Sequence, residues 1–173
     1  SVDPASFRDP SGFVFRDNGI LYRQINRSYR EEFDLLLSSG LYQKLRDERL
    51  IVEHSEVSPQ LAQTEEAYKI IRPALVRFWS YPYEWSFSEL KDAAIATLRI
   101  QGIALEHGML LKDASAYNIQ FVDGKPLLID TLSFEKYREG EPWVAYRQFC
   151  QHFLAPLALM AHRDVRLNQL LKI

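Results

Sequence analysis

Residues 105–134, LEHGMLLKDASAYNIQFVDGKPLLIDTLSF, carry the strongest structural signal in the chain. The pattern predicts a hairpin with strands over 119–122 and 125–129, because Asp123-Gly124 is a typical two-residue turn and Gly tolerates a positive φ. Asn118 enters this hairpin and Asp130 leaves it, so we expect both to lie near the same end. Asp113 lies five residues before Asn118 and can reach the same space.

These three side chains offer the oxygen atoms that a hard cation prefers. Mg²⁺ usually takes one or two carboxylates and fills its remaining positions with phosphate oxygens and water. Asp113, Asn118 and Asp130 would therefore suit a metal-bound phosphate. A purely structural role is the alternative, because Asp113 can cap a turn and Asn118 can satisfy the local backbone.

The segment resembles the catalytic region of the protein-kinase-like superfamily, which includes small-molecule kinases. That family has an Asp, an Asn five residues later, a short hairpin, and then a metal-binding Asp about a dozen residues on. Here Lys112-Asp113 stands in place of Arg-Asp, and Asp130-Thr131-Leu132 in place of Asp-Phe-Gly. The resemblance implies that Asp113 orients or deprotonates the acceptor hydroxyl, while Asn118 and Asp130 hold Mg²⁺ on ATP.

The N-terminal third predicts a small sheet and a helix. Asn18-Gly19 is a strong hairpin signal between strands near 12–15 and 20–25, and a helix with Glu31 and Glu32 in its first turn should follow. In the kinase-like family a strand Lys grips the nucleotide phosphates and pairs with a Glu of the following helix. Arg23 is the positional substitute, with Glu31 or Glu32 as its partner. A surface ion pair is the alternative interpretation.

The nucleotide-covering elements are less clear in the sequence. No GxGxxG loop is present, and Pro10-Ser11-Gly12 is the candidate for a divergent phosphate-covering loop. Strands are predicted over 50–52 and 67–72. By resemblance, residues 80–85 would be an inter-lobe hinge in which Tyr83 and Glu84 contact ATP. Packing between lobes is the alternative, because aromatic residues dominate core energetics.

Two helical regions are predicted after this hinge. Ser86 to Glu89 forms a capping box, and apolar residues at helical spacing then continue to a left-handed Gly108. The region 143–161 is also predicted to be helical, with Pro156 breaking or kinking it. His152 points from that helix and would either support the Asp113 loop by hydrogen bonds or face solvent; the same alternatives hold for Arg147.

Composition sets limits on the class of protein. The apolar fraction of 47% and aromatic fraction of 13% can form a core, and the net charge of −2 gives no electrostatic case for binding nucleic acid. The lone Cys150 fits a reducing compartment. No apolar run reaches the ~20 residues of a membrane span and no signal peptide is visible, so we expect a cytoplasmic protein without a membrane partner.

The predicted fold is α+β: a two-lobed kinase-like unit with a reduced β-rich N-lobe over 1–80 and a truncated helical C-lobe over 81–173. The opening Ser1-Val2-Asp3-Pro4 and the apolar end suggest a fragment of a longer protein. The resemblance implies a bacterial source, often with an S-adenosylmethionine-dependent methyltransferase domain downstream. Two functions are therefore expected: an ATP- and Mg²⁺-dependent phosphotransferase with a small-molecule or atypical acceptor, or a non-catalytic module that binds nucleotide or positions a methyltransferase substrate.

Overall fold

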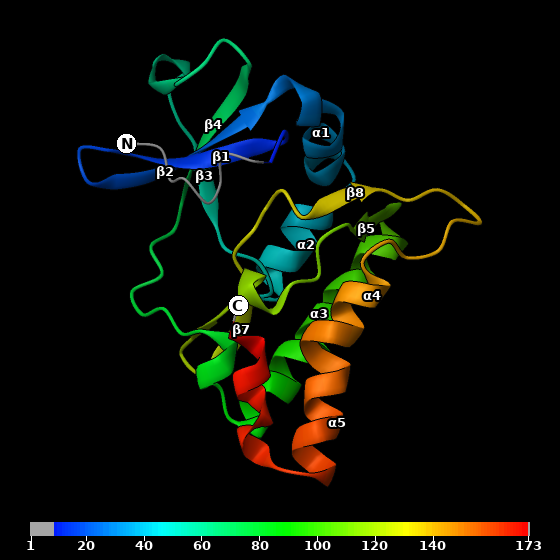
Figure 1. The fold of residues 1–173 in the computed structure, drawn as a ribbon. Coiled ribbons are helices and arrows are strands. Elements are labelled where there is room, and N and C mark those ends of the chain that lie inside the picture. Colours follow the sequence, from blue (N-terminus) through cyan, green and yellow to red (C-terminus); the bar gives the residue numbers. More distant parts are fainter. Residues whose placement is uncertain (1–8, 173) are drawn as a thin grey trace.

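The computed structural model describes residues 9–172, so the expected cut at residues 1–4 and the end at Ile173 lie outside the described residues. The chain forms a mixed α+β structure in which a small sheet packs on a larger helical part (Figure 1). The strands are β1 Gly12–Asp17, β2 Ile20–Asn26, β3 His54–Glu56, β4 Ala67–Pro73, β5 Met109–Leu111, β6 Ile119–Val122, β7 Lys125–Leu128 and β8 Phe134–Lys136.

Helices of three kinds connect these strands and form most of the C-terminal half. The α-helices are α1 Arg30–Ser38, α2 Leu41–Asp47, α3 Phe87–Glu106, α4 Tyr146–Phe149 and α5 Ala155–His162. Short 3₁₀ helices are η1 Arg27–Tyr29, η2 Pro59–Leu61, η3 Pro82–Glu84, η4 Ala116–Asn118 and η6 Val165–Leu171, and a π-helical segment, η5, spans Cys150–Leu154.

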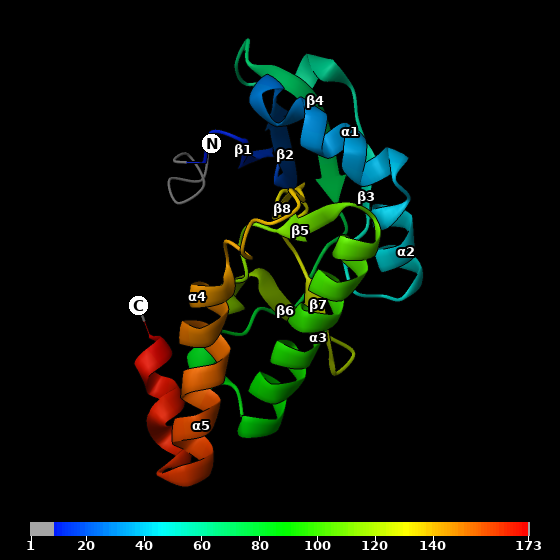
Figure 2. The ribbon, with the colours of Figure 1, turned by 90° about the vertical axis from the view of Figure 1, so that its right-hand side faces the viewer.

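The sheet of the N-terminal part has the order β1-β2-β4-β3, and its pairs are all antiparallel. The first hairpin is as predicted, with Asn18 at φ 47° and Gly19 at φ 78°. Figure 2 shows α1 and α2 covering one side of this sheet. The predicted strand over 50–52 is wrong: Ile51 makes only an isolated parallel bridge to Leu128, and β3 begins at His54.

The two faces of the sheet have different partners because side chains alternate along a strand. Phe13, Phe15, Tyr22 and Ile70 form a small cluster on one face. Ile25 lies on the other face and belongs to the main core, which continues through Phe134 into the helical part. Arg23 shares the face of Ile25 by the same period of two. The strand therefore directs Arg23 toward the helical part of the molecule.

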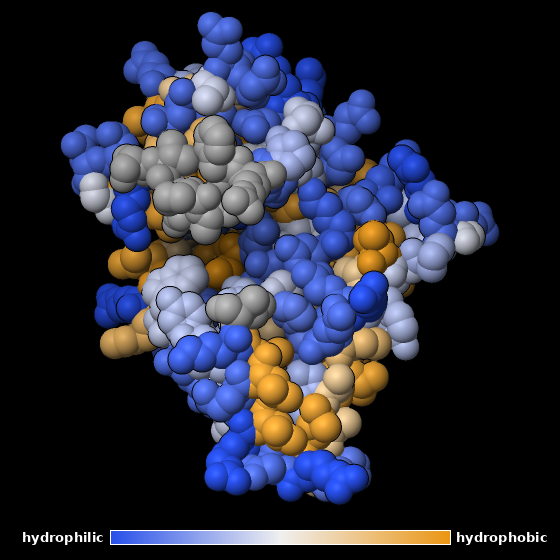
Figure 3. All heavy atoms as spheres, viewed as in Figure 1, coloured by the Kyte–Doolittle hydropathy of each residue, from blue (hydrophilic) through white to orange (hydrophobic). Residues whose placement is uncertain are grey.

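The predicted boundary near residue 80 falls in an extended segment, 74–81, that joins β4 to η3. Leu75 is 81% exposed and Phe78 is 84% exposed in this segment. Exposed apolar side chains also gather over α5 and η6 in the lower half of Figure 3, and the exposed apolar residues of these two helices include Leu159, Val165 and Leu170. Among the described helices, none is both long enough and apolar enough to cross a membrane.

The C-terminal helical region largely agrees with the sequence prediction of a helix over 143–161 that Pro156 breaks or kinks. Helical backbone begins at Tyr146 with α4, passes through the π-helical η5, and continues as α5 to His162. Helical backbone runs without a break from Tyr146 to His162, so Pro156 lies inside it, directly after the π-helical segment. Because Pro lacks an N–H and crowds the carbonyl of the preceding turn, the irregular turn adjoins the proline for which the sequence predicted a break or kink. Such turns occur frequently at functional sites.

Candidate functional site

The β6–β7 hairpin brings Asn118 and Asp130 to one end, as the sequence predicted. Its register pairs Ile119 with Leu128, and the turn residues Asp123 and Gly124 have φ values of 51° and 74°. The Ile129 N–H donates to the Asn118 carbonyl at 2.8 Å, which closes the open end of the hairpin. A surface pocket of about 310 Å³ includes Lys125 at the opposite, turn end, so it is not this site.

Asp113 is held in a defined orientation by the chain around it. Its Oδ1 accepts hydrogen bonds from the Ser115 N–H at 2.9 Å and from the Gln148 amide at 2.8 Å. The Gln148 carbonyl oxygen in turn accepts from the Ala114 N–H at 2.7 Å. Gln148 thus fixes both the carboxylate and the backbone beside it. Asp113 Oδ2 makes none of the hydrogen bonds found among the described residues and remains available for a ligand.

Arg23 reaches Asp130 from the sheet and forms an ion pair with it. The distance from Nη1 to Oδ1 is 2.6 Å, and the two side chains are only 14% and 19% exposed. The same Oδ1 accepts from the Leu132 N–H at 2.9 Å. The Arg23 Nε is buried without a hydrogen-bond partner. Arg23 therefore retains an unused donor within the site.

The expected pairing of Arg23 with Glu31 or Glu32 is wrong. Within the described part of the chain, the ion pair of Arg23 is with Asp130. Glu31 is exposed and Glu32 is half-buried in the first turn of α1, where carboxylates favour the positive end of the helix dipole. The carboxylate partner of Arg23 thus comes from the hairpin and not from the helix that follows β2.

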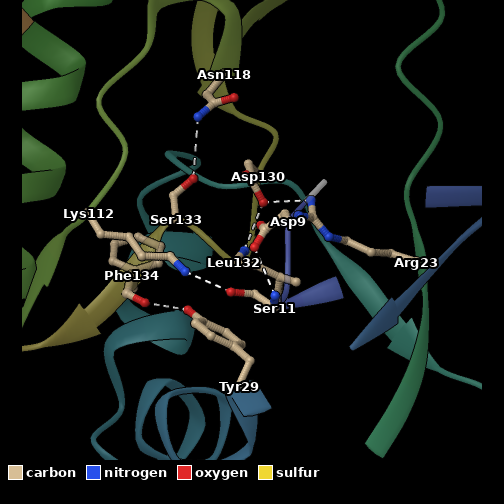
Figure 4. A network of polar contacts seen from close by, with 10 residues as sticks. All are labelled: Asp9, Ser11, Arg23, Tyr29, Lys112, Asn118, Asp130, Leu132, Ser133 and Phe134. Carbon is tan, nitrogen blue, oxygen red and sulfur yellow. Dashed lines mark hydrogen bonds and ion pairs between the residues drawn. The ribbon is translucent and has the colours of Figure 1, made fainter. Parts of the chain in front are cut away.

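Ser133 connects the three segments of the site, although the sequence analysis did not identify it. The residue is fully buried, and its Oγ lies 3.5 Å from the Asn118 amide nitrogen. Its carbonyl accepts from the Lys112 N–H at 2.8 Å, and its own N–H donates to the Asp130 carbonyl at 3.3 Å. Figure 4 shows Asn118, Asp130 and Lys112 around this serine. A serine after a strand-end Asp has no distinctive sequence signal.

Lys112 and Tyr29 join the helical part to the N-terminal part on the other side of the site (Figure 4). The Lys112 Nζ donates to the Ser11 Oγ at 2.8 Å and lies 4.7 Å from the centre of the Tyr29 ring. The Tyr29 hydroxyl donates to the Phe134 carbonyl at 2.5 Å. Burial, and then the negative charge of Asp130, raise the pKa of Tyr29 well above its ordinary value, so this hydroxyl keeps its proton.

The Pro10-Ser11-Gly12 segment lies next to the loop that carries Lys112, where a phosphate-covering element was expected. Gly12 has φ 153°, and a Cβ placed on it would come within 2.1 Å of the Gln24 carbonyl oxygen. The close approach of β1 to β2 therefore requires glycine at this position. Ser11 is held by Lys112 and by its own N–H bond to the Asp9 carboxylate at 2.8 Å.

His152, on the π-helical segment, supports the Asp113 loop, as one of the two sequence interpretations had it. Its Nδ1 accepts from the Ala116 N–H at 3.2 Å and lies 3.4 Å from the Ser115 Oγ. Burial lowers the pKa of His152, although the charge of Asp113 acts in the opposite direction. A neutral ring with its proton on Nε2 fits these contacts. Arg147 is exposed, and the neighbouring Gln148 makes the loop contacts.

Tyr83 and Glu84, the expected hinge contacts of ATP, each have a polar group that already bonds within the protein. The Tyr83 carbonyl accepts from the side chains of Asn168 at 2.9 Å and Gln169 at 2.6 Å. The Glu84 carboxylate accepts from the Tyr81 N–H at 2.8 Å. These residues fasten η3 to η6. Packing of the C-terminal segment against this region explains why the backbone groups are already occupied.

The oxygen atoms at the hairpin end fit Mg²⁺ only as a partner of phosphate. Among residues 9–172, no three His, Cys, Asp or Glu side chains gather closely enough to hold a metal ion by themselves. Asp130 supplies one carboxylate, and Asn118 supplies an amide oxygen from the same end of the hairpin. Mg²⁺ is commonly bound by one or two carboxylates together with substrate phosphates, which suits this donor set. Asp130 and Asn118 would hold such an ion.

The chain is similar to one part of a longer curated protein. Over 162 residues, or 92% of this chain, it is 38% identical to nodulation protein NoeA of Rhizobium meliloti (strain 1021). The chain spans 34% of the length of that protein, about one third. No protein-family model matches the chain. The NoeA sequence thus extends well beyond the region that this chain resembles.

Proposed function

We propose that this chain is a kinase-like domain that binds ATP with Mg²⁺ and transfers phosphate to a small-molecule or atypical acceptor. The observation that carries the proposal is the meeting of Arg23, from a strand of the sheet, with Asp130, from the end of the hairpin. Separate parts of the molecule thereby supply a phosphate-binding cation and a metal-binding carboxylate at one place. Such a combination is the usual requirement of phosphoryl transfer, in which catalysis is mainly positioning and charge neutralisation.

The other residues take roles that match their contacts. Asp113 accepts the proton of the acceptor hydroxyl while that oxygen forms a bond to the terminal phosphorus of ATP, and the bond from phosphorus to the β-phosphate oxygen breaks. Gln148 keeps the Asp113 carboxylate oriented, since it bonds to Oδ1 and leaves Oδ2 for the acceptor. Mg²⁺, when bound, supplies charge neutralisation on the phosphates. Lys112 holds the Ser11 segment beside them.

A non-catalytic nucleotide-binding module is the second candidate, and a specific observation favours it. Arg23 and Asp130 neutralise each other directly, and the Pro10–Gly12 region has no glycine-rich phosphate loop. A domain of this kind would bind nucleotide to regulate or position a neighbouring domain. The ordered contacts of Asp113 weigh against this candidate, because a half-buried carboxylate with a free oxygen is not needed for folding alone.

Thermal unfolding with and without ATP and Mg²⁺ tests the proposal. A ligand that binds only the native state stabilises it by about 2.7 kcal/mol when its concentration is 100 times Kd. We expect the wild-type protein to gain thermal stability with ATP plus Mg²⁺, and Asp130→Asn to lose the part of this gain that needs Mg²⁺. Asp92→Asn is the matched control, because Asp92 is exposed on α3 away from the hairpin end.

Phosphate turnover then separates the two candidates. A transferase should consume ATP in the presence of its acceptor, and Asp113→Asn should reduce the turnover while leaving the ATP-induced stabilisation in place. A binding module should show the stabilisation without turnover for either protein. If ATP and Mg²⁺ leave the melting temperature of the wild-type protein unchanged, both candidates are wrong.

A further inference from the structure

The carboxylate assigned to the metal is already in use. The Arg23 Nη1 lies 2.6 Å from the Asp130 Oδ1, inside a site where both side chains are mostly buried. A divalent cation that approached this oxygen would meet the guanidinium at nearly the same place. Like charges repel strongly in such a partly desolvated environment. The ion pair therefore opposes the binding of a metal ion that arrives alone.

Among the described residues, the ion pair of Arg23 is with Asp130. Glu31 and Glu32, the expected partners, make no ion pair with it in this part of the chain. A metal that displaced Arg23 from Asp130 would leave a largely buried cation uncompensated, which is strongly unfavourable. An anion that approached Arg23 alone would meet the opposite obstacle, since it would leave the Asp130 carboxylate without its partner.

We infer that the Arg23–Asp130 pair is an interlock that admits metal and phosphate only together. This inference rests on the proposed function and adds a binding rule to it. When both arrive, Asp130 exchanges the guanidinium for the metal, and Arg23 exchanges the carboxylate for a phosphate oxygen. Each of the two buried charges keeps one partner of opposite sign in this exchange, so neither is left alone.

The unpaired Nε of Arg23 indicates which kind of ligand the side chain would bind after it leaves Asp130. Its Nε is buried without a hydrogen-bond partner while Nη1 contacts Asp130. Arg donates through a planar fork that matches two oxygens of a phosphate. A phosphate group would give Nε the acceptor that it lacks while Arg23 is paired with Asp130. The interlock thus selects a phosphate-bearing ligand with its cation over either component.

Metal binding and phosphate binding are linked thermodynamically, so the direction in which each substitution changes the two affinities can be predicted. If phosphate strengthens metal binding by some factor, metal strengthens phosphate binding by the same factor, and such factors are commonly about 5- to 150-fold. Removing one member of the pair should release the other. Arg23→Gln should therefore tighten the binding of metal alone and weaken that of the nucleotide complex. Asp130→Asn should tighten the binding of metal-free ATP and make it independent of metal.

The experiment measures Mn²⁺ binding by the loss of the paramagnetic resonance signal of the free ion, and ATP binding by calorimetry with and without Mn²⁺. The whole 173-residue chain is compared with Arg23→Gln, Arg23→Lys and Asp130→Asn. Arg72→Gln and Asp92→Asn are controls of the same chemistry at exposed positions. Thermal melting confirms that each variant is folded.

We expect Arg23→Gln to bind Mn²⁺ alone at least about 5-fold more tightly than the wild type, in line with common coupling strengths. The same variant should bind the Mn²⁺–ATP complex more weakly than the wild type does. In Arg23→Lys and in both controls, Mn²⁺ alone should still bind more weakly than the Mn²⁺–ATP complex, as in the wild type. Asp130→Asn tests the other half of the pair, because this variant should bind metal-free ATP more tightly than the wild type does. The inference therefore does not depend on the folding of one variant.

The outcomes separate the interlock from the proposed function. Tight wild-type binding of Mn²⁺–ATP, combined with unchanged or weaker Mn²⁺ binding by Arg23→Gln, overturns the interlock and leaves the proposed function standing. Failure of the wild type to bind Mn²⁺–ATP overturns both. Opposite-signed effects of Arg23→Gln on metal and on nucleotide support the interlock, because general destabilisation would weaken both.

Discussion

Replacement of Gln148 by Leu tests whether this side chain holds the Asp113 loop. The change removes a hydrogen bond of 2.8 Å to the Asp113 carboxylate and one of 2.7 Å from the Ala114 N–H. A hydrogen bond to a charged group contributes about 1.5–3 kcal/mol, and leaving a buried donor unsatisfied costs about 1–3 kcal/mol. Ala114 is 2% exposed, so water does not readily replace the lost partner. We expect a loss of about 2–4 kcal/mol in the free energy of unfolding.

Urea unfolding followed by circular dichroism measures this loss, with an unchanged m value showing that the folded state is retained. Arg147→Leu is the matched control, because Arg147 precedes Gln148 on α4 and is exposed, and its replacement should change stability by less than about 0.5 kcal/mol.

Gln148→Glu adds a charge test at the same position. It would place a second carboxylate beside Asp113, and the destabilisation should lessen as the pH falls and one of the two carboxyl groups takes up a proton. Gln148→Leu with a stability within about 0.5 kcal/mol of wild type would refute the positioning role.

Three further predictions concern the parts that frame the site. Gly12→Ala should destabilise the fold by more than about 1 kcal/mol in urea unfolding, since the new Cβ would lie 2.1 Å from a carbonyl oxygen, whereas Gly124→Ala at an open turn should cost less. Tyr29→Phe should cost about 1–3 kcal/mol by the same assay, because it leaves the Phe134 carbonyl without its buried donor. Burial lowers the pKa of His54 to about 4 from 6.5, so its contribution to stability is complete above pH 6.5 and is lost as the pH falls toward 4. At about 1.4 kcal/mol per unit this contribution is at most ~3 kcal/mol, less after allowing for partial exposure, and His54→Gln should flatten the stability profile between those pH values.

Local signals predicted much of the fold correctly. The Asn18-Gly19 and Asp123-Gly124 turns and the Ser86 capping box all occur as expected. Each depends on steric limits or hydrogen bonds among residues only a few positions apart, so the sequence states them directly. The relative position of Asn118 and Asp130 followed from one such turn. These parts of the site are therefore predictable from the sequence alone.

The faces of helix α3 show where periodicity becomes insufficient. Leu98 and Leu105 fit the helical spacing of the apolar residues, yet they are 47% and 44% exposed, while Ile100 and Ala104 are fully buried. The buried residues Leu90, Ala93, Thr97, Ile100 and Ala104 keep one face along the whole helix, at alternating spacings of three and four. Leu98 and Leu105 lie beside that face, because the elements packed against α3 decide where the buried stripe ends.

The sequence alone predicted the hairpin that carries Asn118 and Asp130, because its turn arises from neighbouring residues. Tertiary packing decided which side chains meet the site residues: Arg23, from the sheet, meets Asp130, and within the helical part Gln148 meets Asp113 and Ser133 meets Asn118. Such pairings depend on how distant elements approach one another, and a charged or amide side chain carries no mark of its future partner. For this reason the expected pairing of Arg23 with Glu31 or Glu32 was wrong, and Arg23 pairs with Asp130 instead.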